Sequence, residues 1–164
     1  MTDPALLRRQ AYVDGSWTDA DSGEVQNIRN PANGRPVGTV PVMGAAETRR
    51  AIAAAERALG PWRALAAKDR AARLRRWFEL MIAHRDDLAH LMVLEQGKPL
   101  AEARGEIVYA ASFVEWFAEE AKRAYGDIIP APQADRRILV LKQPIGVTAA
   151  ITPWNFPAAM VTRK

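Results

Sequence analysis

The sequence contains no cysteine. This absence excludes a disulfide framework, a thiolate zinc site and a cysteine nucleophile within these 164 residues. Histidine is scarce as well, because the chain has only His84 and His90. They are six residues apart, which is about 240° around a helix, so they would not share a face and would make poor metal partners. We therefore predict no metal site.

Long apolar runs are also missing. No stretch approaches the ~18 consecutive apolar residues that a membrane-spanning helix needs. The first nine residues include Asp3 and Pro4 and have no apolar centre, unlike a secretory signal. These absences predict a cytoplasmic protein with no membrane partner.

Charge of one sign is hardly in excess, since 23 basic residues stand against 19 acidic ones for a net charge of +4. The arginines of residues 70–76 are flanked by acidic residues such as Asp69 and Glu79. We interpret them as a solvated helix face and predict no nucleic-acid partner. The content of 49% hydrophobic and 26% charged residues indicates a globular chain, either one domain or part of a larger one.

Residues 1–43 have the pattern of short strands and turns. Asp14-Gly15 separates residues 11–13 from residues 16–18, and Asp-Gly supplies the positive φ angles of a type I′ hairpin turn. Residues 37–40 form another short strand pattern. We predict a β-rich N-terminal lead-in without a core of its own.

Residues 44–126 predict helices. The first covers residues 45–59 and is expected to end at Gly60-Pro61, the second extends from about residue 71 to Gly97, and the third from Pro99 to about residue 125. Gly126 is a candidate C-cap for the third helix. The buried candidates of that helix are Ala103, Ile107, Ala110, Val114, Phe117 and Ala121, and Trp62, Trp77 and Trp116 are interpreted as packing anchors.

The character changes after residue 127. An extended connector precedes a strand at residues 137–143, within a segment that spans 127–145. Residues 146–151 are an almost uninterrupted apolar run, which is typical of a strand buried on both faces of a parallel sheet. Such a strand has no parallel partner in this chain. We therefore expect the chain to be the front part of a larger α/β protein, cut at its first crossover.

Residues 152–157, Thr-Pro-Trp-Asn-Phe-Pro, would lie beyond the carboxyl end of that strand, where ligands bind in open α/β sheets. Asn155 stands between two aromatic residues and two prolines, so its amide could be a preorganised donor to a developing oxyanion. The alternative is that Asn155 caps the following helix, with Pro157 in the first turn. The residues alone leave both interpretations open.

This hexapeptide resembles the signature at the first strand of the cofactor-binding domain in the NAD(P)-dependent aldehyde dehydrogenase superfamily. Further matching motifs occur in the expected order at residues 12–17, 30–34, 95–99, 101–103, 105–106 and 141–147. The resemblance covers nearly the whole chain, but only the N-terminal part of the family's length. It implies an α/β fold with a β-hairpin lead-in (1–43), a helical part of the cofactor-binding domain (44–126), an oligomerisation-type strand (127–145) and the first strand of a Rossmann-like parallel sheet (146–164).

The resemblance also implies roles for residues near the end of the chain. Asn155 matches the amide that holds the aldehyde oxygen during thiol attack, and Phe156 matches a wall of the substrate tunnel. Lys164 matches a lysine near the proton-relay water, although a surface lysine is the alternative. The residues that would line the nicotinamide side of an NAD or NADP pocket are Ile151, Thr152, Pro153, Trp154 and Asn155.

Residues 158–164 are similar to those of succinate-semialdehyde dehydrogenases, in which the arginine at the position of Arg163 grips the distal carboxylate of the substrate. The planar guanidinium suits this task because it pairs with a carboxylate at two points. A helix that starts near Phe156 would place Arg163 two turns later on the same face. A solvated arginine is the alternative interpretation.

We therefore predict an enzyme that oxidises a small aldehyde, of the succinate-semialdehyde type, through a cysteine thiohemiacetal and thioester. The cysteine and the general base would lie beyond Lys164, so these 164 residues are expected to be inactive alone. The full-length protein is expected to be a homo-oligomer. The alternatives are an aldehyde dehydrogenase of another substrate class and a non-catalytic helical interaction module that pairs through residues 137–143.

Overall fold

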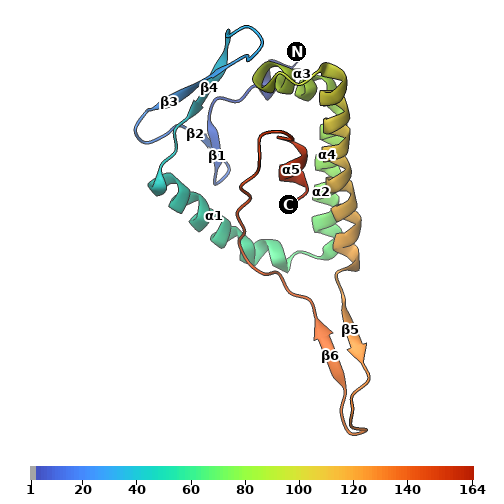
Figure 1. Cartoon of the computed structure of the whole chain (residues 1–164). Coiled ribbons are helices and arrows are strands. Elements are labelled where there is room, and N and C mark those ends of the chain that lie inside the picture. The colour runs from blue at the N-terminus through green and yellow to red at the C-terminus, as the bar shows by residue number, and fades with distance from the viewer. Residues whose placement is uncertain (1–2) are drawn as a thin grey trace.

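The computed structural model describes residues 3–164 and shows helices arranged around a short C-terminal helix, with three separate β-hairpins (Figure 1). Residues 1 and 2, which belong to the predicted lead-in and to the N-terminal stretch predicted not to be a secretory signal, lie outside the described residues. In chain order the elements are η1 (Pro4–Leu6), β1 (Ala11–Val13), β2 (Ser16–Thr18), β3 (Val25–Arg29), β4 (Pro36–Pro41), α1 (Ala45–Ala64), α2 (Ala67–Ala83), α3 (Arg85–Gln96), α4 (Leu100–Glu120), η2 (Ala121–Arg123), β5 (Gly126–Ile129), β6 (Ile138–Leu141) and α5 (Ala159–Thr162).

The β1–β2 hairpin forms as its turn sequence predicts. Asp14 and Gly15 have φ angles of 51° and 80°, the left-handed values that a type I′ turn requires. Tyr12 pairs with Trp17 across the hairpin, and their ring centroids lie 5.1 Å apart. The predicted strand at residues 37–40 is confirmed within β4, which pairs antiparallel with β3.

The core lies where α4 packs against α2, α3 and α5. Of the predicted buried residues, Ala103, Ile107, Ala110 and Val114 are buried, which confirms the stripe along most of α4. Phe117 is exposed, as are all three tryptophans that were interpreted as packing anchors, namely Trp62, Trp77 and Trp116. These four side chains are 41–60% exposed, so the predictions of a buried Phe117 and of tryptophan packing anchors are wrong, whereas Ala121 is partly buried.

Two features of the first helices differ from the prediction, and one helix end agrees with it. Helix α1 continues through Gly60-Pro61 to Ala64, because a proline removes one backbone donor but does not prevent the next turn from forming. The predicted second helix is two helices, α2 and α3, broken at His84, whose φ of −101° and ψ of 17° are not helical. Gly97 ends α3 in the left-handed conformation, as expected of a stop signal.

Gly126 is not a helix cap but the first residue of β5. Helix α4 ends at Glu120, and a turn of 3₁₀ helix follows it. A Cβ at Gly126 would overlap the carbonyl oxygen of Val140 on β6, so glycine is needed here for close approach of two backbones.

The strand β6 lies inside the predicted segment 137–143 and pairs antiparallel with β5, which the sequence pattern did not indicate. Ile128 pairs with Leu139, and Gly126 with Leu141. The hairpin projects away from the helices at the lower end of the molecule in Figure 1.

The apolar run at residues 146–151 forms no strand in this structure. It continues a coil that runs from residue 142, and Ile151 at its end is 98% exposed. The run forms no strand because none of the described residues offers a neighbouring strand to hydrogen-bond with its backbone. No helix within residues 3–164 is long and apolar enough to cross a membrane.

Candidate functional site

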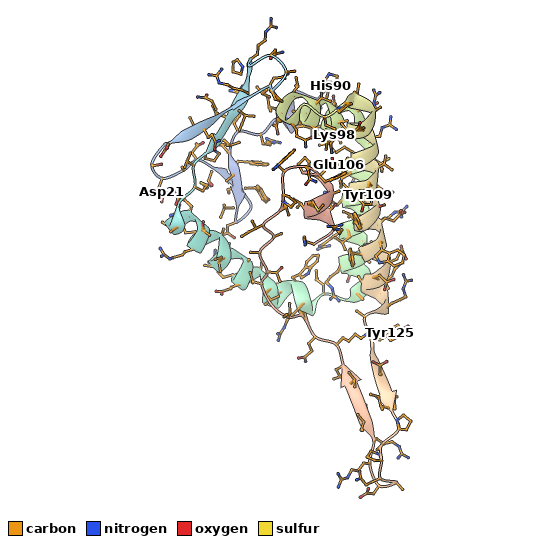
Figure 2. All side chains as sticks on the ribbon, in the orientation of Figure 1. Asp21, His90, Lys98, Glu106, Tyr109 and Tyr125 are labelled. Atoms are coloured by element: carbon orange, nitrogen blue, oxygen red, sulfur yellow. The ribbon has the colours of Figure 1, made fainter. Side chains whose placement is uncertain are left out.

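An open groove of about 520 Å³ lies between the first half of α4 and the turn before α5. It is lined by Gln96, Lys98, Glu102, Gly105, Glu106, Tyr109, Trp154, Asn155 and Phe156. In Figure 2, Lys98, Glu106 and Tyr109 follow one another beside α4, next to this turn. The groove therefore joins three of the predicted site residues to residues that lie about fifty positions earlier in the chain.

Glu106 is the most buried charged residue of the groove, with 3% of its surface exposed. Its Oε2 forms an ion pair with the Nζ of Lys98. Its Oε1 accepts hydrogen bonds from the backbone amides of Ala158, at 3.0 Å, and Ala159, at 3.4 Å. Both carboxylate oxygens are thus occupied inside the protein.

Lys98 and Gln96 bind the other side of the same turn. The Nζ of Lys98 donates to the carbonyl oxygen of Asn155 at 2.9 Å and lies 4.2 Å from the centroid of the Phe156 ring. The side-chain amide of Gln96 donates to the carbonyl oxygens of Trp154, at 3.1 Å, and Asn155, at 3.3 Å. The main chain of the turn is therefore held by side chains from α3, the α3–α4 connection and α4.

Asn155 does not cap the helix that follows it. The N-cap of α5 is Ala158, without a side-chain hydrogen bond, and the capping acceptor is Glu106 instead. The side chain of Asn155 is exposed at the groove, and among residues 3–164 nothing hydrogen-bonds to its amide. Lys98 and Gln96 therefore hold the backbone of Asn155, whereas its side-chain amide has no hydrogen-bond partner among the described residues.

The other predicted site residues lie outside the groove. Ile151 and Pro153 are exposed, and Thr152 is partly buried. Arg163 is exposed, with its Nη2 3.0 Å from the sulfur of Met160, and Lys164 is exposed at the end of the chain. The structure therefore brings together Trp154, Asn155 and Phe156 but does not place Arg163 beside them. Helix α5 is assigned to Ala159–Thr162, and a helical hydrogen bond from the amide of Met160 to the carbonyl oxygen of Phe156, at 3.0 Å, precedes it.

One electrostatic feature adjoins the groove. Glu95 precedes Gln96 at the end of α3, and its partial burial raises the pKa of its carboxyl group. Within residues 3–164, no cluster of three or more His, Cys, Asp or Glu side chains could hold a metal ion.

The roles of Gln96, Lys98 and Glu106 were not predictable from the motifs that contain them. One signal was available for Glu106. It falls three residues after Ala103 and four before Ala110, on the apolar stripe of α4, and an acid on a buried face must have internal partners. Nothing in the local sequence indicated that those partners would be the amides of Ala158 and Ala159.

Comparison with known proteins adds to this geometry. Residues 17–164 match the aldehyde dehydrogenase family. The chain belongs to this family. A glutarate-semialdehyde dehydrogenase of Pseudomonas putida is 69% identical to this aldehyde dehydrogenase chain over 164 residues, and a succinate-semialdehyde dehydrogenase [NADP(+)] of Escherichia coli is 68% identical. In both cases the alignment covers 100% of this chain and 34% of the relative.

Solved structures of the family show the same fold for this portion. The succinate-semialdehyde dehydrogenase of Burkholderia pseudomallei superimposes with a TM-score of 0.97 at 63% identity, over 100% of this chain and 34% of that one. A 3,6-anhydro-L-galactose dehydrogenase superimposes with a TM-score of 0.89 at 36% identity, over 95% and 33%. The chain thus spans about a third of the length of these family members, and it corresponds to their N-terminal portion.

Proposed function

We propose that these residues belong to a NAD(P)-dependent aldehyde dehydrogenase that oxidises succinate semialdehyde or a similar carboxylated semialdehyde to the acid. The observation that carries the proposal is the turn at Asn155, whose backbone is held at the groove while its side-chain amide has no hydrogen-bond partner within residues 3–164. Family membership supports the reaction class. The names of the relatives in P. putida and E. coli support a substrate with a second, anionic end.

In this proposal the amide of Asn155 donates to the aldehyde oxygen as that oxygen gains negative charge. A thiolate from a cysteine outside this chain attacks the carbonyl carbon, and water later releases the acid from the thioester. A preorganised amide donor stabilises the developing oxyanion without having to reorient. Phe156 forms a wall of the substrate path, and Arg163 pairs with the distal carboxylate.

The residues at 151–154 fit a nicotinamide cofactor that is bound mainly through the backbone. Among residues 3–164, no hydrogen bond reaches the backbone of Thr152 or Pro153, which follow the apolar run, so these groups remain available to a ligand. The cofactor, when bound, accepts the hydride of the substrate. Lys164 would then adjoin the water that relays the proton. The division at residues 43, 126 and 145 into lead-in, helical part, oligomerisation segment and cofactor-binding core belongs to the same proposal.

A chimera tests the proposal, with these 164 residues replacing the matching third of the P. putida relative. We expect Asn155→Ala to lower kcat by roughly 10²- to 10³-fold, the usual effect of losing an oxyanion donor. The 164-residue chain alone should show no turnover, because it has no thiol. Unchanged kcat in the Asn155→Ala chimera would contradict the assignment.

The substrate class is tested in the same chimera by Arg163→Leu. We expect KM for succinate semialdehyde to rise by roughly 10- to 100-fold, the effect of losing a hydrogen-bonded charge pair, while KM for an uncharged aldehyde changes little. Arg49→Leu, at an exposed arginine of α1, is the matched control. Equal losses for both aldehydes would argue for a substrate without a distal carboxylate.

The β5–β6 hairpin supports a second proposal, that the protein assembles as a homo-oligomer. One face of the hairpin presents Ile128, Leu139 and Leu141, which are 67–78% exposed. A non-catalytic interaction module would use the same surface, but it would not need the free amide of Asn155. Turnover by the chimera separates the two.

A further inference from the structure

The ion pair between Lys98 and Glu106 is unusual in this chain because it is the one salt bridge among residues 3–164 with both side chains largely buried, at 10% and 1% exposure. Burying a carboxylate is costly unless it is paired and hydrogen-bonded. Here the cost is offset by the ammonium of Lys98 and by two backbone amides.

The amides that Glu106 binds belong to the first turn of α5. This helix is only four residues long, Ala159–Thr162, and a helix of that length does not hold itself together. Its N-cap, Ala158, has no side-chain acceptor to offer. A carboxylate from α4, 52 residues earlier in the chain, therefore supplies the acceptor and the negative charge that a helix start favours.

Lys98 acts at the other end of the same turn. Its ammonium donates to the carbonyl oxygen of Asn155 and lies over the ring of Phe156. The ion pair thus holds the turn at two points: Lys98 binds the carbonyl oxygen of Asn155, and Glu106 binds the amides of Ala158 and Ala159. These two attachments restrict backbone rotation between residues 155 and 159.

We propose that Glu106 is a positioning residue, which acts with Lys98 to fix the main chain of the turn at 155–159 and thereby the point from which the Asn155 side chain enters the groove. This inference rests on the proposed function, in which that amide stabilises the oxyanion. Glu106 thus controls how accurately the oxyanion donor is placed, although its carboxylate touches neither substrate nor cofactor. A misplacement of about 1 Å at such a donor is enough to lower a rate substantially.

The test uses a double variant that removes the pair without leaving a buried charge. Replacing a buried ion pair by apolar side chains of similar volume is often neutral for stability, so Lys98→Met/Glu106→Met should fold. A merely structural pair would then be dispensable. A positioning pair would not, because methionine offers neither an acceptor to the α5 amides nor a donor to the Asn155 carbonyl. The single variant Glu106→Gln, which keeps one acceptor oxygen, provides a second measurement.

The first readout is hydrogen exchange on the 164-residue chain. We expect the amides of Ala158 and Ala159 to exchange roughly tenfold faster in the double variant, as befits the loss of a charge-assisted hydrogen bond. Glu102→Gln is the matched control, since it changes a carboxylate that lines the same groove one helical turn away. Glu47→Gln controls for general loss of stability, because Glu47 is buried in the first turn of α1 and its carboxylate binds the amides of Asp21 and Gly44, away from this turn. Unchanged exchange in the double variant, or equally fast exchange in Glu47→Gln, overturns the inference.

The second readout is kinetic and uses the chimera with the P. putida relative. The double variant should lower kcat by roughly tenfold and leave KM for the semialdehyde within about twofold, because the substrate still binds but the oxyanion donor is misplaced. Faster exchange with unchanged kcat overturns the positioning role. A chimera without any turnover contradicts the proposed function instead, and the exchange experiment then still decides whether Glu106 holds the turn.

Discussion

Two glutamates are buried in the part of the chain that the structure describes, Glu47 and Glu106, and each accepts hydrogen bonds from the backbone of another segment. Glu47 lies in the first turn of α1, and its oxygens accept from the amides of Asp21 and Gly44, each at 3.0 Å. These amides hold the pKa of the Glu47 carboxyl below its ordinary value of 4.5, with the amide of Asp21 as the largest cause. A single side chain thereby ties the loop after β2 to the start of α1.

The lowered pKa predicts an acid-dependent loss of stability. Because the folded pKa lies below the unfolded one, the contribution of Glu47 is complete above pH 4.5 and is lost as pH falls through the lowered value. We therefore expect Glu47→Gln to reduce Tm by a few degrees near neutral pH and by progressively less in acid. Thermal unfolding at a series of pH values measures this. Glu24→Gln, at an exposed glutamate, is the control, and a difference that stays constant with pH would contradict the argument.

At the scale of elements, glycine is expected to stabilise a left-handed turn and to destabilise a helix. Gly15 has a φ of 80° in the β1–β2 turn, where a side chain is strained even though nothing lies within 4 Å of the added Cβ. Gly105 lies in the middle of α4, is exposed, and also has nothing within 4 Å of an added Cβ. Sterics are therefore equal at the two sites, and only the backbone conformation differs.

We expect Gly15→Ala to destabilise the chain by about 1 kcal/mol and Gly105→Ala to stabilise it by about 0.5–1 kcal/mol. Urea unfolding of the two variants measures both values, and each variant serves as the control for the other. A stabilising Gly15→Ala would show that the turn does not hold its left-handed conformation.

The element boundaries show where sequence patterns stop being informative. The Asp14-Gly15 hairpin and the stop at Gly97 were predictable because their φ angles depend on local side chains. The break at His84 was not, because residues 83–85 contain neither glycine nor proline. The α2–α3 segment bends there so that each half packs along a different part of α4, a consequence of long-range contacts.

At the scale of the whole molecule, the described chain leaves a large apolar surface uncovered. The β5–β6 hairpin projects away from the helices (Figure 1), and its face with Ile128, Leu139 and Leu141 is more exposed than the opposite face with Ile129, Ile138 and Val140. Contiguous exposed apolar surface and unpaired strand edges promote association.

We expect this chain to self-associate through that face, and Leu139→Lys/Leu141→Lys to weaken the association by at least roughly tenfold, since two charges would have to be desolvated. Sedimentation velocity over a range of concentrations measures the effect. Val140→Lys, on the opposite face of the same strand, is the control. If Val140→Lys weakened association as much as the double variant, the contact would involve the other face or the strand edge.

The sequence by itself determined the local turns, most of the apolar stripe of α4, and the family, because motifs and backbone preferences depend on neighbours along the chain. It also located the turn at Trp154, Asn155 and Phe156. The tertiary structure decided how that turn is held: the acceptor for the Ala158 and Ala159 amides comes from Glu106, 52 and 53 residues away. It also decided that residues 146–151 remain a coil, since a strand exists only where another backbone supplies its hydrogen bonds.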